Sequence, residues 1–172
     1  MKKTLLLLIF PCFFFANYAQ EIPEIATDNI TTYYFIRHAE KELSNPNDRN
    51  PKLSNIGIQR AESWAEILKD VPFDIIYSTD YYRTTETAKP IAKLKNLPIT
   101  LVDLNTFNFS VFKESTKGKT ALVVGHSNTT PKMVNDFIQL EKYPKINENN
   151  YSNIYIITII GTTVSDKLLT IN

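Results

Sequence analysis

Apolar and polar residues are arranged along this chain as short β-prone runs separated by segments with helical spacing. Residues 32–36 form a Thr, Tyr, Phe and Ile run that ends in a polar turn, which is typical of a strand. Residues 121–124 form a continuous apolar run closed by Gly125, as expected of a strand buried in a parallel sheet. The same criteria predict four more strands, the last two paired as a hairpin: residues 73–78, 98–102, 154–160 and 168–171.

An amphipathic helix is predicted after the first strand. Ser54 is a suitable N-cap for a helix that runs through Leu68, because its hydroxyl group can accept from a free backbone N–H of the first turn. The apolar stripe of this helix is expected to consist of Ile58, Ala61, Ala65 and Leu68.

Further helical segments lie between the later strands. Thr79 or Asp80 can cap a helix that runs to about Leu94, and residues 106–116 form a loop or a short helix. Thr130 and the proline after it begin another helix, since proline is favoured in the first turn. Strands that alternate with helices predict an α/β fold: a three-layer sandwich with a mostly parallel central sheet and helices on both faces.

The amino terminus has the layout of a secretory signal peptide, at residues 1–19. Two lysines precede an apolar block over residues 5–15, and the small residue Ala19 precedes a polar segment. The block is shorter than the roughly 20 apolar residues that span a membrane, although a retained single-pass anchor is the alternative. We expect a polar lead over residues 20–30 and a single domain over residues 31–172, exported to the periplasm or secreted.

Composition narrows the range of partners. Cys12 is the only cysteine and lies in the predicted signal peptide, so the mature chain would hold no disulfide in its oxidising compartment. The chain has 19 basic and 18 acidic residues, and Lys2 and Lys3 leave with the signal peptide. The remaining charge is close to zero, which favours neither nucleic acid nor a membrane surface as a partner.

Both histidines of the chain directly follow predicted strands. His38 comes after Arg37 at the end of the first strand, and His126 comes after Gly125 at the end of another. In open α/β sheets, ligands bind just beyond the carboxyl ends of the strands. We therefore expect the two histidines to converge on one crevice.

Two arginines and one predicted helix start suit a phosphate in that crevice. Arg37 and Arg83 each offer a planar fork of donors that matches phosphate oxygens two at a time. Ser127 and the residues up to Thr130 add backbone N–H groups at a helix start, which is a second kind of anion site.

Each of these residues also has an ordinary structural explanation. Arg37 could be exposed at the end of its strand, and Arg83 could pair on its own helix with Glu86 or Asp80. His126 could be buried in the core. These explanations together require several coincidences at strand ends, which favours the phosphate site.

Four blocks of sequence, in a fixed order, carry a family resemblance. Residues 37–41 read Arg-His-Ala-Glu-Lys, and residues 53–57 read Leu-Ser-Asn-Ile-Gly. Residues 77–88 form a strand-to-helix block that contains Arg83, and residues 125–131 form the second histidine block. Through these blocks the sequence resembles the histidine phosphatase superfamily, with the phosphoglycerate-mutase-like fold, in its short bacterial branch. The resemblance spans residues 31 to about 160, nearly the whole mature chain.

The resemblance implies a mechanism. His38, neutral and held through one ring nitrogen by a backbone carbonyl group, would attack phosphorus and form a phosphohistidine. Arg37, Arg83 and a protonated or donor-form His126 would surround the phosphoryl oxygens. Neither a metal nor a cofactor is required, and the expected partner is a phosphorylated small molecule or a phosphoprotein.

The carboxylic acid that protonates the leaving oxygen is where the chain departs from the family pattern. The insertion that carries this acid in the mutases is too short here, and Ser127 stands where the other large branch has an aspartate. Asp103 is the first candidate, because it follows the predicted strand at residues 98–102 and strand ends face the same crevice. Glu40 and Glu114 are the alternatives.

We therefore expect an exported phosphohydrolase. The shortened insertion argues against a mutase, which must enclose its intermediate while the substrate turns round. The alternatives are a phosphohistidine or phosphoprotein phosphatase of the cytoplasm, if the signal peptide prediction is wrong, and a non-catalytic phosphate-binding module.

Overall fold

The computed structural model describes residues 30–103 and 106–171, so the predicted signal peptide and nearly all of the polar lead lie outside the described residues. The strands are β1 (Ile30–Arg37), β2 (Ile75–Thr79), β3 (Ile99–Val102), β4 (Thr120–Gly125), β5 (Asn153–Ile160) and β6 (Thr163–Thr170). The helices are α1 (Asn55–Ile67), α2 (Tyr82–Lys95), α3 (Phe109–Ser115) and α4 (Thr129–Ile138).

The strands form one sheet in the order β3-β2-β4-β1-β5-β6. The first four strands of this order run parallel to one another. β5 pairs antiparallel with β1, and β6 pairs antiparallel with β5. The predicted α/β sandwich with a mostly parallel sheet is confirmed, and the predicted hairpin extends the sheet beyond β1.

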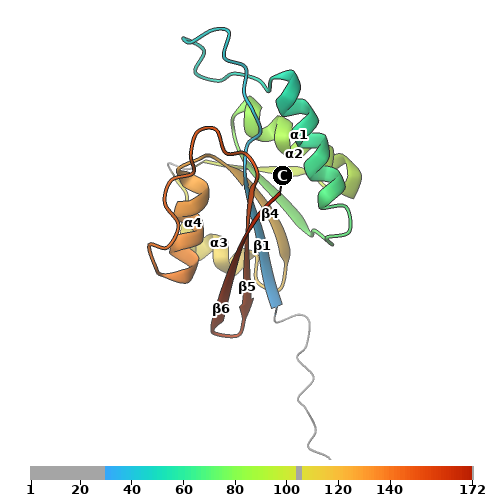
Figure 1. Cartoon of the computed structure of the whole chain (residues 1–172). Coiled ribbons are helices and arrows are strands. Elements are labelled where there is room, and N and C mark those ends of the chain that lie inside the picture. Colours follow the sequence, from blue (N-terminus) through green and yellow to red (C-terminus); the bar gives the residue numbers. More distant parts are fainter. Residues whose placement is uncertain (1–29, 104–105, 172) are drawn as a thin grey trace, which may run out of the picture.

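Helices cover both faces of the sheet (Figure 1), with α1 and α2 on one face and α3 and α4 on the other. The alternating side chains of β1 fill both layers. Tyr33 and Phe35 pack with Phe137 of α4 in one core, whereas Ile36 packs with Trp64 of α1 in the other. Full burial of a large apolar side chain contributes about 1.5–3 kcal/mol, so both layers hold β1 at the centre of the molecule.

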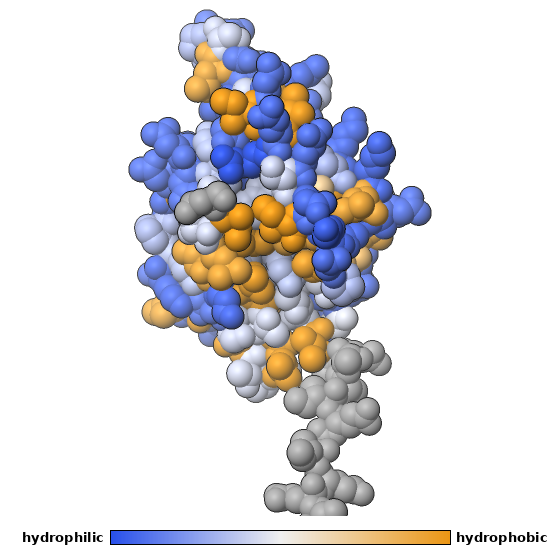
Figure 2. Space-filling view, turned by 45° about the vertical axis from the view of Figure 1, so that its right-hand side comes forward, coloured by the Kyte–Doolittle hydropathy of each residue, from blue (hydrophilic) through white to orange (hydrophobic). Residues whose placement is uncertain are grey.

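The buried stripe of α1 differs from the prediction at one position. Ile58 is 48% exposed, whereas Gly57, Ala61 and Trp64 are buried. The helix therefore turns a different edge toward the sheet than the apolar pattern predicted. Figure 2 shows other apolar side chains at the surface, gathered across the middle of the face drawn and surrounded by hydrophilic ones.

The start of α2 also differs from the prediction. Its N-cap is Tyr81, whose side chain makes no capping hydrogen bond, and the Asn50 side chain accepts instead from the N–H of Tyr82 at 2.9 Å. Thr79 ends β2 instead, and its hydroxyl group contacts Thr84 and the ring of His126. A residue predicted to cap a helix thus belongs to the surroundings of a histidine.

A close backbone contact holds α1 against the segment that follows β1. The backbone N–H of Ser54 donates to the carbonyl oxygen of Glu40 at 2.9 Å, and the Ser54 hydroxyl group accepts from the N–H of Gly57, which confirms the predicted cap. A Cβ atom at position 57 would overlap the same Glu40 carbonyl oxygen. Only glycine at position 57 lets the helix approach the backbone of Glu40 this closely, and Glu40 lies two residues after His38.

We expect Gly57→Ala to destabilise the protein, although alanine normally stabilises a helix interior by about 1 kcal/mol relative to glycine. The added methyl group has to push the Glu40 backbone away, and overpacking of this kind costs about 1–3 kcal/mol. Urea unfolding monitored by circular dichroism measures the change. Ser63→Ala, at an exposed position of the same helix, is the control and should be neutral or slightly stabilising. Equal stabilisation by both substitutions would contradict the close contact.

Candidate active site

The two histidines meet because their strands are neighbours in the sheet. β1 pairs with β4 in a register that sets Arg37 opposite Gly125. The backbone N–H of His38 continues this pairing by donating to the Gly125 carbonyl oxygen at 2.9 Å. The rings of His38 and His126 lie with their centroids 5.5 Å apart and their planes inclined at 67°. The structure thus brings together residues that are far apart in the sequence.

The ring of His38 is fixed in one tautomer by its neighbour. Nδ1 lies 2.7 Å from the carbonyl oxygen of Ala39. Because a carbonyl oxygen only accepts, Nδ1 carries the proton and Nε2 keeps its lone pair. The pKa of His38 is lowered to about 3, mainly by burial and also by the charges of Arg37 and Arg83, while the Ala39 hydrogen bond opposes this effect. His38 is therefore a neutral imidazole near pH 7.

The ring of His126 is held between a hydroxyl group and a guanidinium. Nε2 lies 2.9 Å from the Thr79 hydroxyl oxygen, and Nδ1 lies 3.4 Å from Nη2 of Arg83. A guanidinium only donates, so Nδ1 accepts and Nε2 carries the proton. Burial, together with the charge of Arg83, lowers the pKa of His126 to about 4. In this state His126 is neutral rather than protonated.

Arg37 is buried and enclosed by the loop that precedes β5. Its Nη1 lies 2.9 Å from the carbonyl oxygens of Asn147 and Glu148 and 3.0 Å from that of Asn150. Its Nη2 donates to the Glu148 carboxylate at 2.8 Å, and its Cζ lies 4.2 Å from the centre of the Tyr151 ring. Arg37 is only 2% exposed, so it is not an ordinary surface residue at a strand end.

Arg83 lies on the other side of the histidine pair. Its Cζ is 4.4 Å from the centre of the Tyr81 ring, which also contacts His126 edge-on. Glu86, a suggested partner, accepts instead from the backbone N–H of Leu53 at 2.8 Å. Among the described residues, Nη1 of Arg83 and Nε of Arg37 are buried without a hydrogen-bond partner. Buried donors are nearly always satisfied, so both arginines retain capacity for a bound anion.

These groups line one cavity of about 380 Å³. Its walls are Arg37, His38, Lys41, Tyr81, Arg83, His126, Ser127, Asn128, Thr129 and Glu148. All of the predicted site residues except the acid line the cavity. Ser127, Asn128 and Thr129 follow β4 at the start of α4, and Glu148 belongs to the loop before β5. Three lining residues were not predicted from the sequence: Lys41, Tyr81 and Glu148. Lys41 and Tyr81 lie within the blocks of residues 37–41 and 77–88, whereas Glu148 lies outside all four blocks.

The structure does not bring the predicted acid to this cavity. Asp103 follows β3, is exposed, and is not among the residues that line the cavity. β3 is an edge strand, separated from β1 by β2 and β4. Three strand spacings of about 4.8 Å amount to roughly 14 Å between β3 and β1, so a shared sheet edge did not place Asp103 beside His38.

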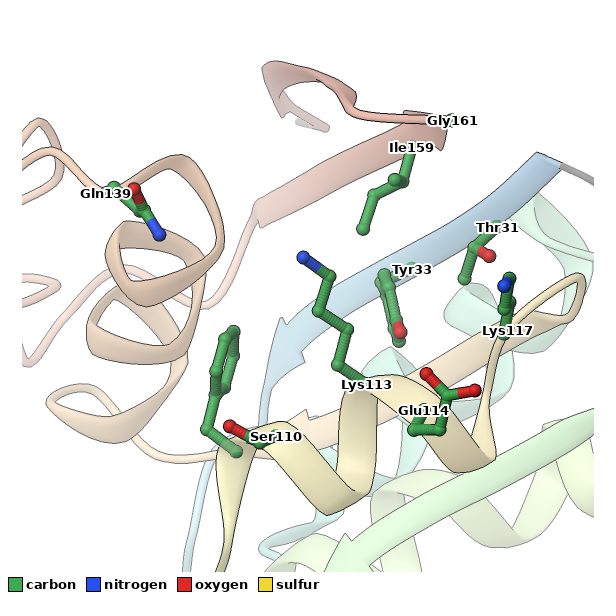
Figure 3. A pocket seen from close by; sticks show the side chains of 10 residues that line it. Thr31, Tyr33, Ser110, Lys113, Glu114, Lys117, Gln139, Ile159 and Gly161 are labelled. Atoms are coloured by element: carbon green, nitrogen blue, oxygen red, sulfur yellow. The ribbon is translucent and has the colours of Figure 1, made fainter.

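The two alternative acids are also placed elsewhere. The carboxylate of Glu40 accepts from Nε of Arg60 through both oxygens, at 2.8 and 2.9 Å. Glu114 lines a different cavity of about 670 Å³, with Lys113 and Thr31 among its walls (Figure 3). Thr31 is seven residues before His38 on an extended strand, or roughly 23 Å away at about 3.3 Å per residue.

Two further properties concern the part of the chain that the structure describes, residues 30–103 and 106–171. No cluster of three or more His, Cys, Asp or Glu side chains is arranged there to hold a metal ion. In the same residues, no helix is long and apolar enough to cross a membrane.

Solved structures share this fold at low sequence identity. The protein histidine phosphatase SixA complexed with tungstate is 15% identical, with a TM-score of 0.63 over 81% of this chain and 96% of that one. Phosphoglycerate mutase from Bacillus anthracis is 16% identical, with a TM-score of 0.62 over 83% and 94% of the two chains. Phosphoserine phosphatase from Entamoeba histolytica, in complex with 3-phosphoglyceric acid, is 20% identical, with a TM-score of 0.58 over 83% and 96%.

Sequence comparison is more specific. No curated protein matches the sequence significantly. Residues 33–113 match the family model of the histidine phosphatase superfamily (branch 1). The matched part contains His38 and Arg83 and ends before the block of His126, which the fold brings back to His38. The family match over residues 33–113, together with the shared fold, therefore supports the histidine phosphatase superfamily and a hydrolase of the phosphatase type.

Proposed function

We propose that the chain is an exported phosphohydrolase that removes a phosphoryl group through a phosphohistidine on His38, without a metal ion. One observation carries the proposal: two neutral imidazoles lie side by side in a cavity with two arginines that retain unpaired donors. A neutral imidazole with a free lone pair is a nucleophile. Unpaired guanidinium donors in a partly buried cavity bind and stabilise a phosphoryl anion.

The transfer begins at Nε2 of His38, which forms a bond to phosphorus while the bond from phosphorus to the leaving oxygen breaks. Nε of Arg37 and Nη1 of Arg83 are the donors available to the phosphoryl oxygens. They act on the charge spread over these oxygens in the transition state. Attack by water then breaks the phosphohistidine and returns the electron pair to Nε2.

A phosphorylated small molecule or a phosphoprotein is the proposed substrate. The structural neighbours named protein histidine phosphatase and phosphoserine phosphatase support this class. The test is a panel of phosphomonoesters and phosphoamino acids, including phosphohistidine, incubated with the purified protein in EDTA. Release of phosphate from at least one compound is expected, and no release from any of them would contradict the proposal.

Vanadate is expected to inhibit the enzyme strongly, and EDTA is expected to have no effect. Arginine and histidine side chains line the cavity, and guanidinium groups suit tetrahedral anions. An analogue of the transition state binds more tightly than substrate. Initial rates on an aryl phosphate, with each reagent titrated separately, provide the measurement. Activity that disappears in EDTA and returns with a divalent cation would contradict metal independence.

Export is expected to yield a soluble extracytoplasmic product that begins near Gln20. The basic head, apolar block and small residue before the polar segment support this proposal. Fractionation of cells that express the full chain, followed by amino-terminal sequencing, is the measurement. A cytoplasmic product that retains residues 1–15 would instead support the cytoplasmic alternative.

A further inference from the structure

Glu148 is the one carboxylate among the described residues that line the histidine cavity, and both of its oxygens are engaged. Oε2 accepts from Nη2 of Arg37 at 2.8 Å. Oε1 accepts from the Ser127 hydroxyl group at 3.2 Å and pairs with Nζ of Lys145 at 2.9 Å. The Glu148 side chain is nevertheless 60% exposed, against 2% for Arg37. It lies at the rim of the cavity, where a change of rotamer can separate it from the buried arginine while it still lines the cavity.

The Glu148 carboxylate accepts a hydrogen bond from Nη2 of Arg37, a donor that a bound phosphoryl group needs. Nη1 of Arg37 already donates hydrogen bonds to three carbonyl oxygens. Nε, which is unpaired, and Nη2, which holds Glu148, form the remaining edge of the guanidinium. Such an edge binds two oxygens of one phosphate. A phosphoryl group that uses both donors displaces Glu148 from Arg37 and leaves the carboxylate beside the reacting atoms.

We propose that Glu148 is the proton-transfer carboxylate of this site, displaced from Arg37 by the phosphoryl group and then acting first as acid and afterwards as base. The inference rests on the proposed phosphatase function. It is favoured by position, because Asp103 and Glu114 lie outside the cavity and Glu40 is paired with Arg60.

The two half-reactions balance with one proton on Glu148. In the first, a bond forms between Nε2 of His38 and phosphorus, the bond to the leaving oxygen breaks, and the Glu148 proton passes to that oxygen. In the second, a water oxygen bonds to phosphorus and the nitrogen–phosphorus bond breaks, with its electron pair returning to Nε2. The water proton passes to the Glu148 carboxylate, and phosphate leaves.

Displacement also changes the acidity of Glu148 in the required direction. In the free protein, the hydrogen bond from Lys145 and the charge of Arg37 lower the pKa of the Glu148 carboxyl group. Loss of the Arg37 contact and the arrival of a phosphoryl dianion both favour the protonated form. The proton is supplied by solvent or by a substrate that arrives as the monoanion.

The test compares leaving groups in Glu148→Gln. For an alkyl phosphate such as glycerol 2-phosphate, we expect kcat/KM to fall by about 10²-fold or more, the usual contribution of a general acid. For p-nitrophenyl phosphate, kcat/KM should change only a few-fold, because the phenolate leaves without a proton. Slow hydrolysis of the phosphohistidine should also produce a burst of about one equivalent of p-nitrophenolate.

Two matched variants make the comparison decisive. Glu62→Gln, at an exposed position of α1, should behave like the wild type on both substrates. Equal losses on both substrates in Glu148→Gln, or leaving-group dependence in Asp103→Asn instead, would overturn the assignment while the wild type remains active. An inactive wild type would overturn the proposed phosphatase function itself.

Discussion

His38→Ala is expected to abolish hydrolysis of an aryl phosphate while the protein remains folded. The substitution removes the atom that forms the covalent bond to phosphorus, so no partial route through this intermediate remains. A catalytic group of this kind contributes at least about 10²-fold. Steady-state rates on p-nitrophenyl phosphate measure the loss, and transfer of labelled phosphate to the protein should be seen only with the wild type.

Folding of this variant is expected to survive because the His38 ring packs against the rings of His126 and Tyr151 at the cavity and not in the apolar cores of the sheet. Among the described residues, its side chain has one hydrogen bond, from Nδ1 to the Ala39 carbonyl oxygen, whereas the strand pairing uses its backbone N–H. Thermal unfolding of the variant should therefore remain cooperative. If a well-folded His38→Ala protein kept more than about a tenth of the activity, against the 10²-fold loss expected for a catalytic group, the nucleophile assignment would be wrong.

The fold and the convergence of the histidines were predictable because they depend on local patterns and one topological rule. The apolar runs that became β1 and β4 identify buried strands, and parallel strands present their carboxyl ends at one edge. His38 and His126 directly follow these runs. Adjacency of β1 and β4 is what turns two separate strand ends into one site.

The same rule failed for Asp103 because it says nothing about the order of strands in the sheet. β3 belongs to the same parallel set but lies at its edge, three strands from β1. The order of the strands in the sheet is decided by the packing of whole helix and sheet layers, and a local sequence pattern carries no information about this packing.

The partners that surround Arg37 could not be predicted from the sequence either. Its partners in the loop of residues 147–150 are more than 100 positions away along the chain. A polar stretch of this kind is typical of an ordinary connection between a helix and a strand. Its role depends on carbonyl oxygens that any residue type supplies, so residue identity gave no signal except the charge of Glu148.

Arg83→Met is expected to lower kcat/KM by about 10²–10³-fold, the cost of removing one preorganised donor from a charge that develops in the transition state. Lysine at this position should not restore the activity, because a point charge lacks the planar pair of donors. Lys89→Met, at an exposed position of the same helix, is the matched control and should leave the rate unchanged.

The melting temperature of Arg83→Met, compared with that of the wild type, distinguishes a functional role of Arg83 from a structural one. Its Nη1 is buried without a partner, and an unsatisfied buried donor costs about 1–3 kcal/mol. Removing the guanidinium should therefore leave the melting temperature of Arg83→Met unchanged or raise it, while weakening the binding of vanadate. A variant that loses activity because it unfolds would contradict this role. Loss of rate and of anion binding in a protein at least as stable as the wild type would mean that the unpaired donor is kept for the phosphoryl group.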